Sequence, residues 1–302
     1  MHPVTIVDTP AIGFMGVGAI GRPMAERMLA KFPLVVCDVN PSARAYFDGR
    51  ATVIESAKAL GASADVVFAC LPTLESYEQA LLSADGLVAG GRMRKFVLVG
   101  TTGPALVQKM HMALASSGVS ILDAPVTGGV PRAKSGELTV IASGPRLLFD
   151  SVGVMMRCYA SSVVYLGEAP GLAQTMKLIN NMLSAANLAV ASELLVLGVK
   201  AGLDPHQMLE VLNSGTGQNS ATLTKIPHHL LPRSFDYGGR LEVVYKDLAM
   251  CVQEAKNMGL AAPLSDLIAS TYRTAIVQDG PDRDMTEVVR HMERAAGVQV
   301  GP

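Results

Sequence analysis

The 302-residue sequence contains no tryptophan, and aromatic residues make up only 5% of it. Charged residues are also few, at 17%, and the 25 basic and 26 acidic side chains leave a net charge of −1. Proteins that bind nucleic acid usually gather basic residues into a patch or stripe. We therefore expect no nucleic acid among the partners of this protein.

Cysteine is scarce as well. The four cysteines lie far apart and form no CxxC pair. This spacing disfavours a structural zinc site and a secreted disulfide scaffold, and it favours a reducing cytoplasm. The six histidines show no HxxxH or HExxH spacing, so we expect no metal site and interpret His228 and His229 as loop residues.

Long apolar runs are missing too. The longest, residues 181–199, is interrupted by Asn187 and Glu193, so we expect it to fall short of a membrane span. No charged segment followed by an apolar one lies near the first residue, so we expect no secretory signal peptide. Hydrophobic residues still make up 49% of the chain, enough to offset the cost of ordering it. We expect a soluble, cytoplasmic globular protein without a membrane partner.

The length and the pattern of elements predict two domains. Up to residue 166, short apolar runs alternate with helical patterns, which predicts an α/β domain with a doubly wound, mostly parallel sheet. The expected strands are Ile12–Met15, Leu34–Cys37, Val66–Leu71, Phe96–Val99, Ile121–Leu122, Thr139–Ala142 and Val163–Leu166.

The pattern changes at residues 167–171, and only helices are expected beyond them. Residues 176–201 form one long helix that is apolar on nearly every face, which implies burial between domains or subunits and suggests a homodimer or homotetramer. We place the boundary between residues 1–170, an α/β domain, and residues 171–302, an all-helical domain. Further helices are expected at Asp204–Leu212, Tyr245–Met258, Leu264–Gln278 and Met285–Ala296.

A GxGxxG motif lies between the first expected strand and the first expected helix. Its glycines permit a tight turn, the approach of a pyrophosphate and close helix packing, and the helix N-terminus attracts phosphates. Asp38 follows the second strand, where its carboxylate can bind ribose hydroxyls and would repel a 2′-phosphate. We predict a site for NAD rather than NADP; a glycine turn without a ligand is the alternative. The residues assigned to the cofactor here are Gly16, Val17, Gly18, Ala19, Ile20, Gly21, Asp38 and Asn40.

A second motif, Thr127-Gly128-Gly129, follows the strand expected at Ile121–Leu122. Ligands of open α/β sheets gather at the carboxyl ends of strands, and a hydroxyl beside two glycine N–H groups suits a carboxylate. An ordinary flexible loop is the alternative. Asp123, before the turn, is expected only to tie the loop down.

Lys177 and Asn181 lie at i and i+4 near the start of the long helix, so they project from one face. Polar groups on so apolar a helix are costly unless they meet partners or a ligand. A lysine there can take a proton from a hydroxyl while the asparagine holds the oxygen, which predicts general acid/base chemistry. A helix-end lysine with capping amides is the alternative.

Lys246 and Asp247 open the helix expected from Tyr245. The helix dipole accounts for an acidic residue near an N-terminus, so Asp247 needs no other role. Taken alone, Lys246 is most simply a solvated side chain.

These four motifs, in this order, resemble those of the β-hydroxyacid dehydrogenase family, which includes 3-hydroxyisobutyrate dehydrogenase and tartronate semialdehyde reductase. The strings GFMGVGAIGRPMA, LDAPVTGG, KLINNM and YKDLAM carry the resemblance, which extends from Ile12 to about Ala296. It implies a Rossmann domain, a helical C-terminal domain joined by a long helix, and reversible hydride transfer between NAD(P) and a small hydroxy acid.

The resemblance also implies roles for single residues. Lys177 would be the catalytic acid/base assisted by Asn181, and residues 127–129 would bind the substrate carboxylate. Lys246 would lie at the nicotinamide and the substrate, unlike the solvated side chain considered above. Further cofactor contacts would be Leu71, Pro72, Ser76 and Thr102.

Three departures from the family pattern leave the substrate open. Thr127 replaces a commoner serine, Val99 stands where an acidic residue usually opens its segment, and Gly239 stands where an aromatic residue is usual. We expect a 3-hydroxyisobutyrate-like acid, with tartronate semialdehyde or another sugar acid as the alternative. A phosphorylated sugar acid would need clustered basic residues, for which Arg233 and Arg240 are candidates. A non-catalytic dinucleotide-binding module would not need Lys177 and Asn181.

Overall fold

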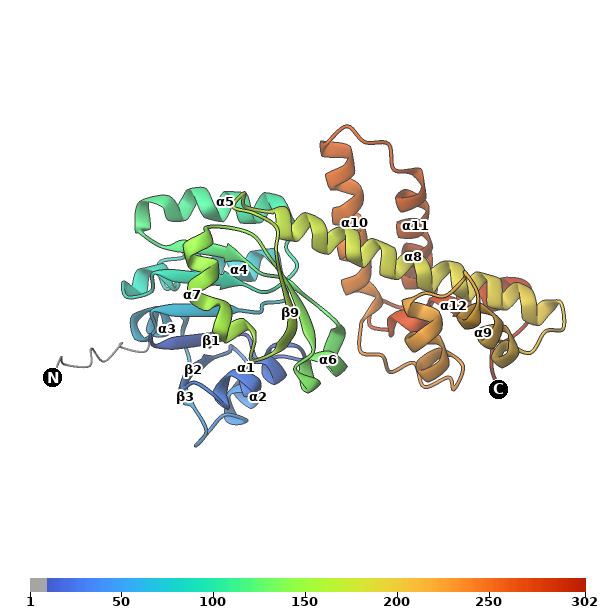
Figure 1. Cartoon of the computed structure of the whole chain (residues 1–302), viewed down its shortest axis with the longest axis horizontal. Coiled ribbons are helices and arrows are strands. Elements are labelled where there is room, and N and C mark those ends of the chain that lie inside the picture. Colours follow the sequence, from blue (N-terminus) through green and yellow to red (C-terminus); the bar gives the residue numbers. More distant parts are fainter. Residues whose placement is uncertain (1–9) are drawn as a thin grey trace. The chain divides into compact units, whose positions relative to one another are not determined.

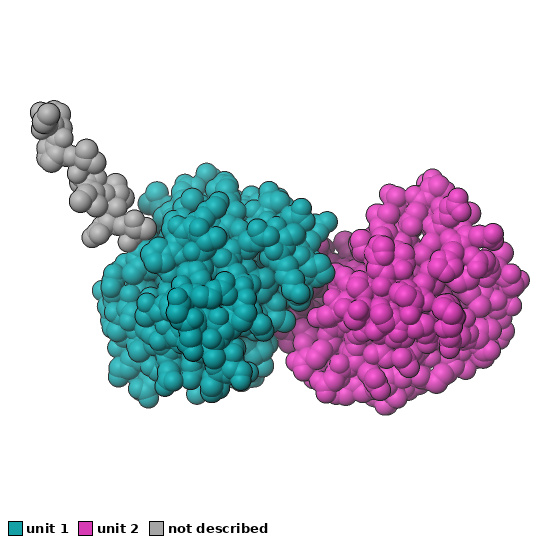
Figure 2. Space-filling model, turned by 90° about the horizontal axis from the view of Figure 1, so that it is seen from below, with its two compact units in different colours: residues 1–177 teal, residues 178–302 magenta. Residues whose placement is uncertain are grey.

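The structure is a computed structural model and describes residues 10–302. The chain divides into two compact units, residues 1–177 and 178–302 (Figure 2). The division falls inside helix α8 (Leu172–Lys200), whereas the boundary expected from the sequence lies just before this helix. One continuous helix therefore contributes its first residues to the first unit and the rest to the second.

The first unit is built on a six-stranded sheet with the strand order β3-β2-β1-β4-β5-β6 (Figure 1). Every neighbouring pair is parallel, which confirms the predicted doubly wound α/β architecture. The strands are β1 (Ile12–Met15), β2 (Leu34–Cys37), β3 (Thr52–Ile54), β4 (Val66–Ala69), β5 (Lys95–Leu98) and β6 (Ser120–Asp123). Strand β3 was not expected, because its three residues are partly exposed and form no apolar run.

Helices cover both faces of this sheet, so all four residues of β4 are buried. Helices α1 (Gly21–Leu29) and α7 (Arg146–Met156) contribute to the core on one face. Helices α3 (Ala57–Ser63), α4 (Leu74–Leu82) and α5 (Pro104–Leu114) contribute to the core on the other. The shorter helical segments of the unit are α2 (Pro41–Ala45), η1 (Val88–Gly90), η2 (Ala115–Ser117) and α6 (Gly129–Ser135).

Three more strands form a separate sheet with the order β7-β8-β9. They are β7 (Val126–Thr127), β8 (Leu138–Ala142) and β9 (Ala160–Tyr165), with β7 antiparallel to β8. The strands expected at residues 139–142 and 163–166 thus exist, but outside the main sheet. The isolated bridge between Asp123 and Ser143 joins the end of β6 to the residue after β8, which brings the two sheets together at this point.

The described residues of the second unit form only helices and connecting loops, as expected. After α8 come α9 (Pro205–Ser214), the π-helix η3 (Ala221–Leu230), α10 (Leu241–Asn257), α11 (Pro263–Asp279), η4 (Met285–Val288) and α12 (Val289–Ala296). The interpretation of His228 and His229 as loop residues is wrong, because both lie in η3, where Pro227 concealed the helical pattern. Helix α10 begins at Leu241, before the predicted start at Tyr245. Its N-cap residue, Arg240, forms no side-chain capping bond, so the sequence carries no capping signal at the true start.

Helix α8 is more apolar than the sequence analysis allowed. By length and composition alone it is able to cross a membrane, since an 18-residue window has a mean hydropathy of 1.8. Half of that window is buried inside the structure, as in the core helix of a soluble protein.

Candidate active site

The glycine-rich loop connects β1 to α1 in the first unit. Gly16 has a φ of +86°, and a Cβ there would lie 2.3 Å from the carbonyl oxygen of Cys70. A Cβ on Gly21 would lie 1.9 Å from the carbonyl oxygen of Gly16. A Cβ on Gly18 would meet nothing within 4 Å. The first two positions therefore require glycine for the turn and for helix packing, and the third leaves the backbone open to a ligand.

The start of α1 is suited to a phosphate. Its N-cap residue, Ile20, provides no side-chain hydrogen bond to the first turn. The N–H groups at an uncapped helix start, together with the helix dipole, bind anions. The open backbone at Gly18 and this uncapped N-terminus fit the pyrophosphate of a dinucleotide.

Asp38 supports the same loop from the end of β2. One carboxylate oxygen accepts a hydrogen bond from the N–H of Val17 at 2.8 Å, and the other accepts one from the N–H of Asn40 at 2.8 Å. Each carboxylate oxygen has a further lone pair for a ribose hydroxyl. Asn40 itself caps α2 through the N–H of Ser42. Asp38 is thus held beside the glycine-rich loop, and its contact with a ribose stays a prediction.

Tyr77, which the sequence analysis missed, holds the loops after β4 and β5. Its buried hydroxyl accepts hydrogen bonds from the N–H groups of Leu71 and Gly100, both at 2.9 Å, and donates to the carbonyl of Ala69 at 3.0 Å. Leu71 and the following Pro72 are predicted cofactor contacts, so Tyr77 fixes the backbone beside them. A tyrosine in an amphipathic helix gives no sequence signal that distinguishes this role from core packing.

Ser76, another predicted cofactor contact, belongs to a capping box at the start of α4. Its N–H donates to the Thr73 hydroxyl, and its own hydroxyl donates to the Thr73 carbonyl at 2.8 Å. The Ser76 hydroxyl therefore has a structural role in capping α4. Its contact with a cofactor stays a prediction.

Gln174, also missed, links the start of α8 to the loop after β5. Its side-chain oxygen accepts hydrogen bonds from the N–H groups of Thr102 and Gly103 at 2.8 and 3.1 Å. Its side-chain amide donates to the carbonyl of Gly100 at 3.0 Å and to Asp123 at 2.7 Å. These side-chain bonds of a fully buried glutamine thus connect the loop that holds the predicted cofactor residue Thr102 to the helix that carries Lys177.

Asp123 caps helix α8 from the end of β6. Its carboxylate accepts from the N–H of Gln174 at 3.0 Å, while the Ser143 hydroxyl accepts from the N–H of Ala173 at 3.0 Å. Burial raises the pKa of Asp123 to about 7, against the opposing effect of the hydrogen bonds from Gln174 and Ser143. The expectation that Asp123 only ties down its own loop was too narrow, because it anchors a helix 51 residues away.

The Thr127-Gly128-Gly129 turn runs from β7 into α6. Gly128 and Gly129 have φ values of +130° and +71°, which favour glycine. A Cβ on Gly128 would also approach Arg132 to 2.9 Å. The turn therefore has a conformation that favours glycine at both positions, and its contact with a carboxylate stays a prediction.

Lys177 lies in the second turn of α8 and is only 9% exposed. Asn181, one turn further on, donates from its side-chain amide to Asp247 at 2.6 Å, and its oxygen accepts from Asn180 at 3.2 Å. These two bonds fix the orientation of the Asn181 amide on the helix face that also carries Lys177.

Asp247 is buried in the middle of α10, and its other oxygen lies 3.2 Å from the Lys246 ammonium. The helix-dipole explanation of Asp247 is wrong, because α10 starts six residues earlier, at Leu241. Asp247 instead joins Asn181 and Lys246, the two residues of the second unit that the resemblance assigned to the site.

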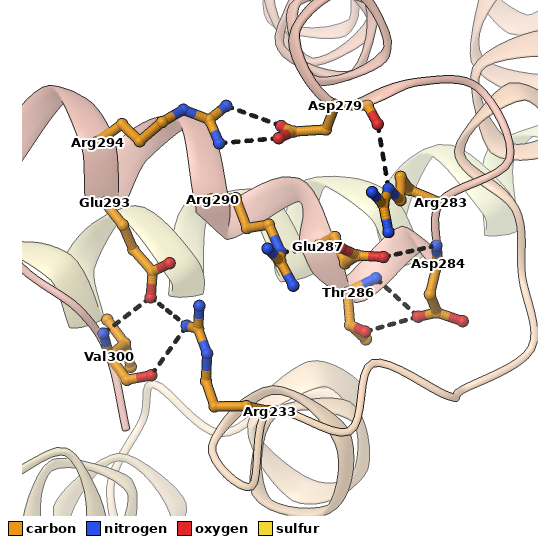
Figure 3. Close-up of polar contacts among 10 residues, drawn as sticks. All are labelled: Arg233, Asp279, Arg283, Asp284, Thr286, Glu287, Arg290, Glu293, Arg294 and Val300. Carbon is orange, nitrogen blue, oxygen red and sulfur yellow. Dashed lines mark hydrogen bonds and ion pairs between the residues drawn. The ribbon is translucent and has the colours of Figure 1, made fainter. Parts of the chain in front are cut away.

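The arginines considered as phosphate ligands already have acidic partners. Arg233 pairs with Glu293 and donates to the carbonyl of Val300, as Figure 3 shows. Arg240 pairs with Glu242 at 2.9 Å and with Asp282 at 3.0 Å. Because their charges are compensated, neither side chain favours a phosphorylated substrate. Within residues 10–302, no group of three or more His, Cys, Asp or Glu side chains could hold a metal ion.

Two family models match the chain. Residues 11–167 match the NAD-binding domain of 6-phosphogluconate dehydrogenase, and residues 171–292 match the NAD-binding family model of NADP-dependent 3-hydroxyisobutyrate dehydrogenase. The chain belongs to the β-hydroxyacid dehydrogenase family. It is an NAD(P)-dependent oxidoreductase that acts on the CH–OH group of a hydroxy acid.

Individual relatives cover nearly the whole chain. An NAD-dependent L-serine dehydrogenase of Pseudomonas aeruginosa is 30% identical over 298 residues, covering 95% of this chain and 99% of the relative. A 2-(hydroxymethyl)glutarate dehydrogenase of Eubacterium barkeri is 26% identical over 292 residues, covering 96% and 97%. The structure of Mycobacterium tuberculosis 3-hydroxyisobutyrate dehydrogenase with L-serine is 26% identical, with a TM-score of 0.84 and coverage of 94% and 99%.

Proposed function

We propose that Lys177 is the general acid/base of this dehydrogenase and that Asn181 holds the reacting oxygen. In the oxidation, the Lys177 amine takes the proton of the substrate hydroxyl; in the reduction, the ammonium returns it. The observation that carries this proposal is the pair itself: a buried lysine lies one helical turn from an asparagine whose amide is fixed by Asp247.

We propose the remaining roles as the motifs and the resemblance to the family imply them. The turn at Thr127, Gly128 and Gly129 binds the substrate carboxylate, and Lys246 provides a positive charge beside the same site. The glycine loop, Asp38, Asn40, Leu71, Pro72, Ser76 and Thr102 bind the dinucleotide. When bound, the nicotinamide accepts or supplies the hydride.

The test is a panel of hydroxy acids followed by NADH absorbance: 3-hydroxyisobutyrate, glycerate, threonate, 3-hydroxypropionate and L-serine. We expect Lys177→Ala to lower kcat roughly 10²- to 10⁴-fold with little change in NADH binding. Lys200→Ala is the control, since Lys200 is the exposed last residue of the same helix and its ammonium donates to the carbonyl of Ala296. An equal loss of catalysis and NADH binding would assign Lys177 a structural role instead.

We also propose that NAD is preferred over NADP. The carboxylate of Asp38 would face the adenosine ribose, where it attracts hydroxyl hydrogens and repels a phosphate. The relatives' names include both cofactors: the Pseudomonas relative is NAD-dependent, and the C-terminal family model is that of an NADP-dependent enzyme.

We further propose that the protein is a cytoplasmic homodimer or homotetramer that associates through helix α8. Within the second unit, five apolar side chains of this helix are 44–62% exposed: Ile179, Leu183, Val190, Leu194 and Leu197. At about 100° per residue they lie on the face opposite to Asn181. A second copy would cover this stripe. Equilibrium sedimentation of Leu183→Glu tests the idea: association must weaken, and an unchanged mass would reject it.

A further inference from the structure

Lys225 is a buried lysine that the proposed reaction does not use. It lies in the π-helix η3 and is only 4% exposed. Its ammonium donates to the Ser184 hydroxyl at 3.0 Å and lies 5.3 Å from the centre of the Tyr237 ring. Within residues 10–302, no carboxylate forms an ion pair with it, and burial alone lowers its pKa.

A buried ammonium without a carboxylate partner is unfavourable, because it has lost its hydration without gaining an opposite charge. One hydroxyl and one aromatic face compensate only part of this loss, since an ammonium has three N–H donors. Ser184 and Tyr237 are themselves only partly buried, so Lys225 lies just beneath the surface. The position is therefore favourable for an anion that reaches these two side chains.

The contact with Ser184 connects Lys225 to the proposed active site. Lys177, Asn181 and Ser184 are spaced i, i+4 and i+7 on α8, so they lie on one face of the helix. At 1.5 Å per residue, Ser184 lies about 5 Å beyond Asn181 and about 10 Å beyond Lys177 along the helix axis. A substrate hydroxyl between Lys177 and Asn181 would thus have Lys225 some 5–10 Å further along the same face.

We propose that Lys225, together with Ser184 and Tyr237, binds a second carboxylate of the substrate, so that the preferred substrate is a dicarboxylic hydroxy acid. This assignment rests on the proposed roles of Lys177 and Asn181 at the hydroxyl. A chain of a few carbon atoms spans the distance. A single ammonium beside a hydroxyl matches one carboxylate, whereas a phosphate is usually met by several cationic donors or by arginine.

Two substrates that differ only in this group make the test sharp. 2-(Hydroxymethyl)glutarate is 3-hydroxyisobutyrate with its methyl group extended by a carboxymethyl group, so the reacting end is the same. For the wild type we expect kcat/KM to be higher for the dicarboxylate. For Lys225→Met we expect kcat/KM for the dicarboxylate to fall about 10- to 100-fold, as for the loss of a charge-assisted hydrogen bond. We expect kcat/KM for 3-hydroxyisobutyrate to change less than about 3-fold.

Two further variants separate specificity from folding. Lys225→Arg keeps the charge and should retain part of the preference for the dicarboxylate. Lys200→Met removes an exposed lysine of α8 and should change neither substrate. Equal losses for both substrates in Lys225→Met, or a wild type that prefers the monocarboxylate, would overturn the proposal while leaving the dehydrogenase function intact.

A binding measurement keeps the question separate from turnover. Calorimetric titration with glutarate, which lacks the hydroxyl, compares the wild type with Lys225→Met in the presence of NADH. If the wild type oxidises neither substrate, the proposed acid/base chemistry fails for them, but binding of glutarate that Lys225→Met abolishes still supports the carboxylate site. Absence of glutarate binding to the wild type rejects the site.

Discussion

Asp123 and Gln174 form two hydrogen bonds with each other, one to the backbone N–H of Gln174 at 3.0 Å and one to its side-chain amide at 2.7 Å. The first bond caps helix α8, and the second orients a side chain whose other contacts hold Thr102 and Gly103. Lys177 follows Gln174 by three residues on this helix. The pair therefore sets the position of the proposed acid/base relative to the loop after β5, within a single compact unit.

Replacement of Gln174 by methionine should lower catalysis more than cofactor binding. Methionine nearly retains the shape of the glutamine side chain, but the N–H groups of Thr102 and Gly103 lose their acceptor, and Asp123 loses a donor. We expect kcat to fall about 10- to 100-fold, because small misplacements of a catalytic group are costly. Steady-state kinetics and NADH titration measure the two effects. Gln253→Met, at an exposed site on α10, is the control. An unchanged kcat in Gln174→Met would show that the position of Lys177 does not depend on the bonds of the Gln174 side chain.

The raised pKa of Asp123 predicts a pH dependence of stability. Burial raises the pKa to about 7 from an ordinary value of 3.8, so the folded protein holds a proton that the unfolded chain has released. The contribution of Asp123 to the free energy of unfolding is therefore fully present below about pH 4 and is lost as the pH rises to about 7. The free energy of unfolding falls over this range by at most about 1.4 kcal/mol per pH unit. Urea unfolding from pH 5 to 8 should show the wild type losing stability relative to Asp123→Asn up to pH 7. A constant difference would mean that Asp123 does not titrate in this range.

The sequence predicted the parallel sheet, the change to helices and the glycine loop because each depends on local patterns. Apolar runs such as Ile12–Met15 specify strands covered on both faces, and GxGxxG specifies its own turn. Three-residue β3 and two-residue β7 are too short to show a period. The start of α10 was misplaced because Arg240 gives no capping signal.

The residues that support the site could not be predicted from the sequence, for a different reason. Gln174, Tyr77 and Asp247 act through partners that are distant in the sequence, such as the 66 residues between Asn181 and Asp247. A single sequence shows the residue but not the contact. Gln174, a polar residue near the start of a largely apolar helix, gave a weak signal, since a buried amide needs partners.

Removal of Asp247 should reduce the contribution of Asn181. In Asp247→Ala the Asn181 amide loses its acceptor and keeps only the bond from Asn180, so its orientation is less fixed and the oxygen of the substrate is held less well. We expect kcat/KM to fall about 10-fold or more, with an unchanged affinity for NADH. Asp266→Ala, an exposed acidic position on α11, serves as the control. If Asp247→Ala retains full activity, Asn181 needs no fixed orientation.

Replacement of Asp38 by asparagine tests the cofactor preference. The change keeps the size of the side chain and removes the charge that repels a 2′-phosphate, although one of the bonds to Val17 and Asn40 weakens. We expect the ratio of kcat/KM for NAD to that for NADP to fall about 10-fold, roughly the effect of removing one like-charge contact. Asp48→Asn, exposed before β3, should leave the ratio unchanged. A wild type that uses NADPH better than NADH would contradict the preference from the start.

Two buried tyrosines provide a matched pair for the last prediction. The Tyr77 hydroxyl has three backbone partners at the ends of β4 and β5, whereas the Tyr159 hydroxyl, equally buried, has no hydrogen-bond partner within residues 10–302. Removing a satisfied buried hydroxyl leaves its partners unpaired, but removing an unsatisfied one relieves a desolvation cost.

Tyr77→Phe should therefore lower the free energy of unfolding by about 2–3 kcal/mol, while Tyr159→Phe should leave it unchanged or raise it by about 1 kcal/mol. Because the N–H groups of Leu71 and Gly100 are freed only in Tyr77→Phe, this variant alone should also bind NADH more weakly. Urea unfolding and NADH titration of both variants measure the two effects. Equal destabilisation by the two substitutions would mean that the Tyr77 hydroxyl does not hold these loops, and that packing of the ring is its whole contribution.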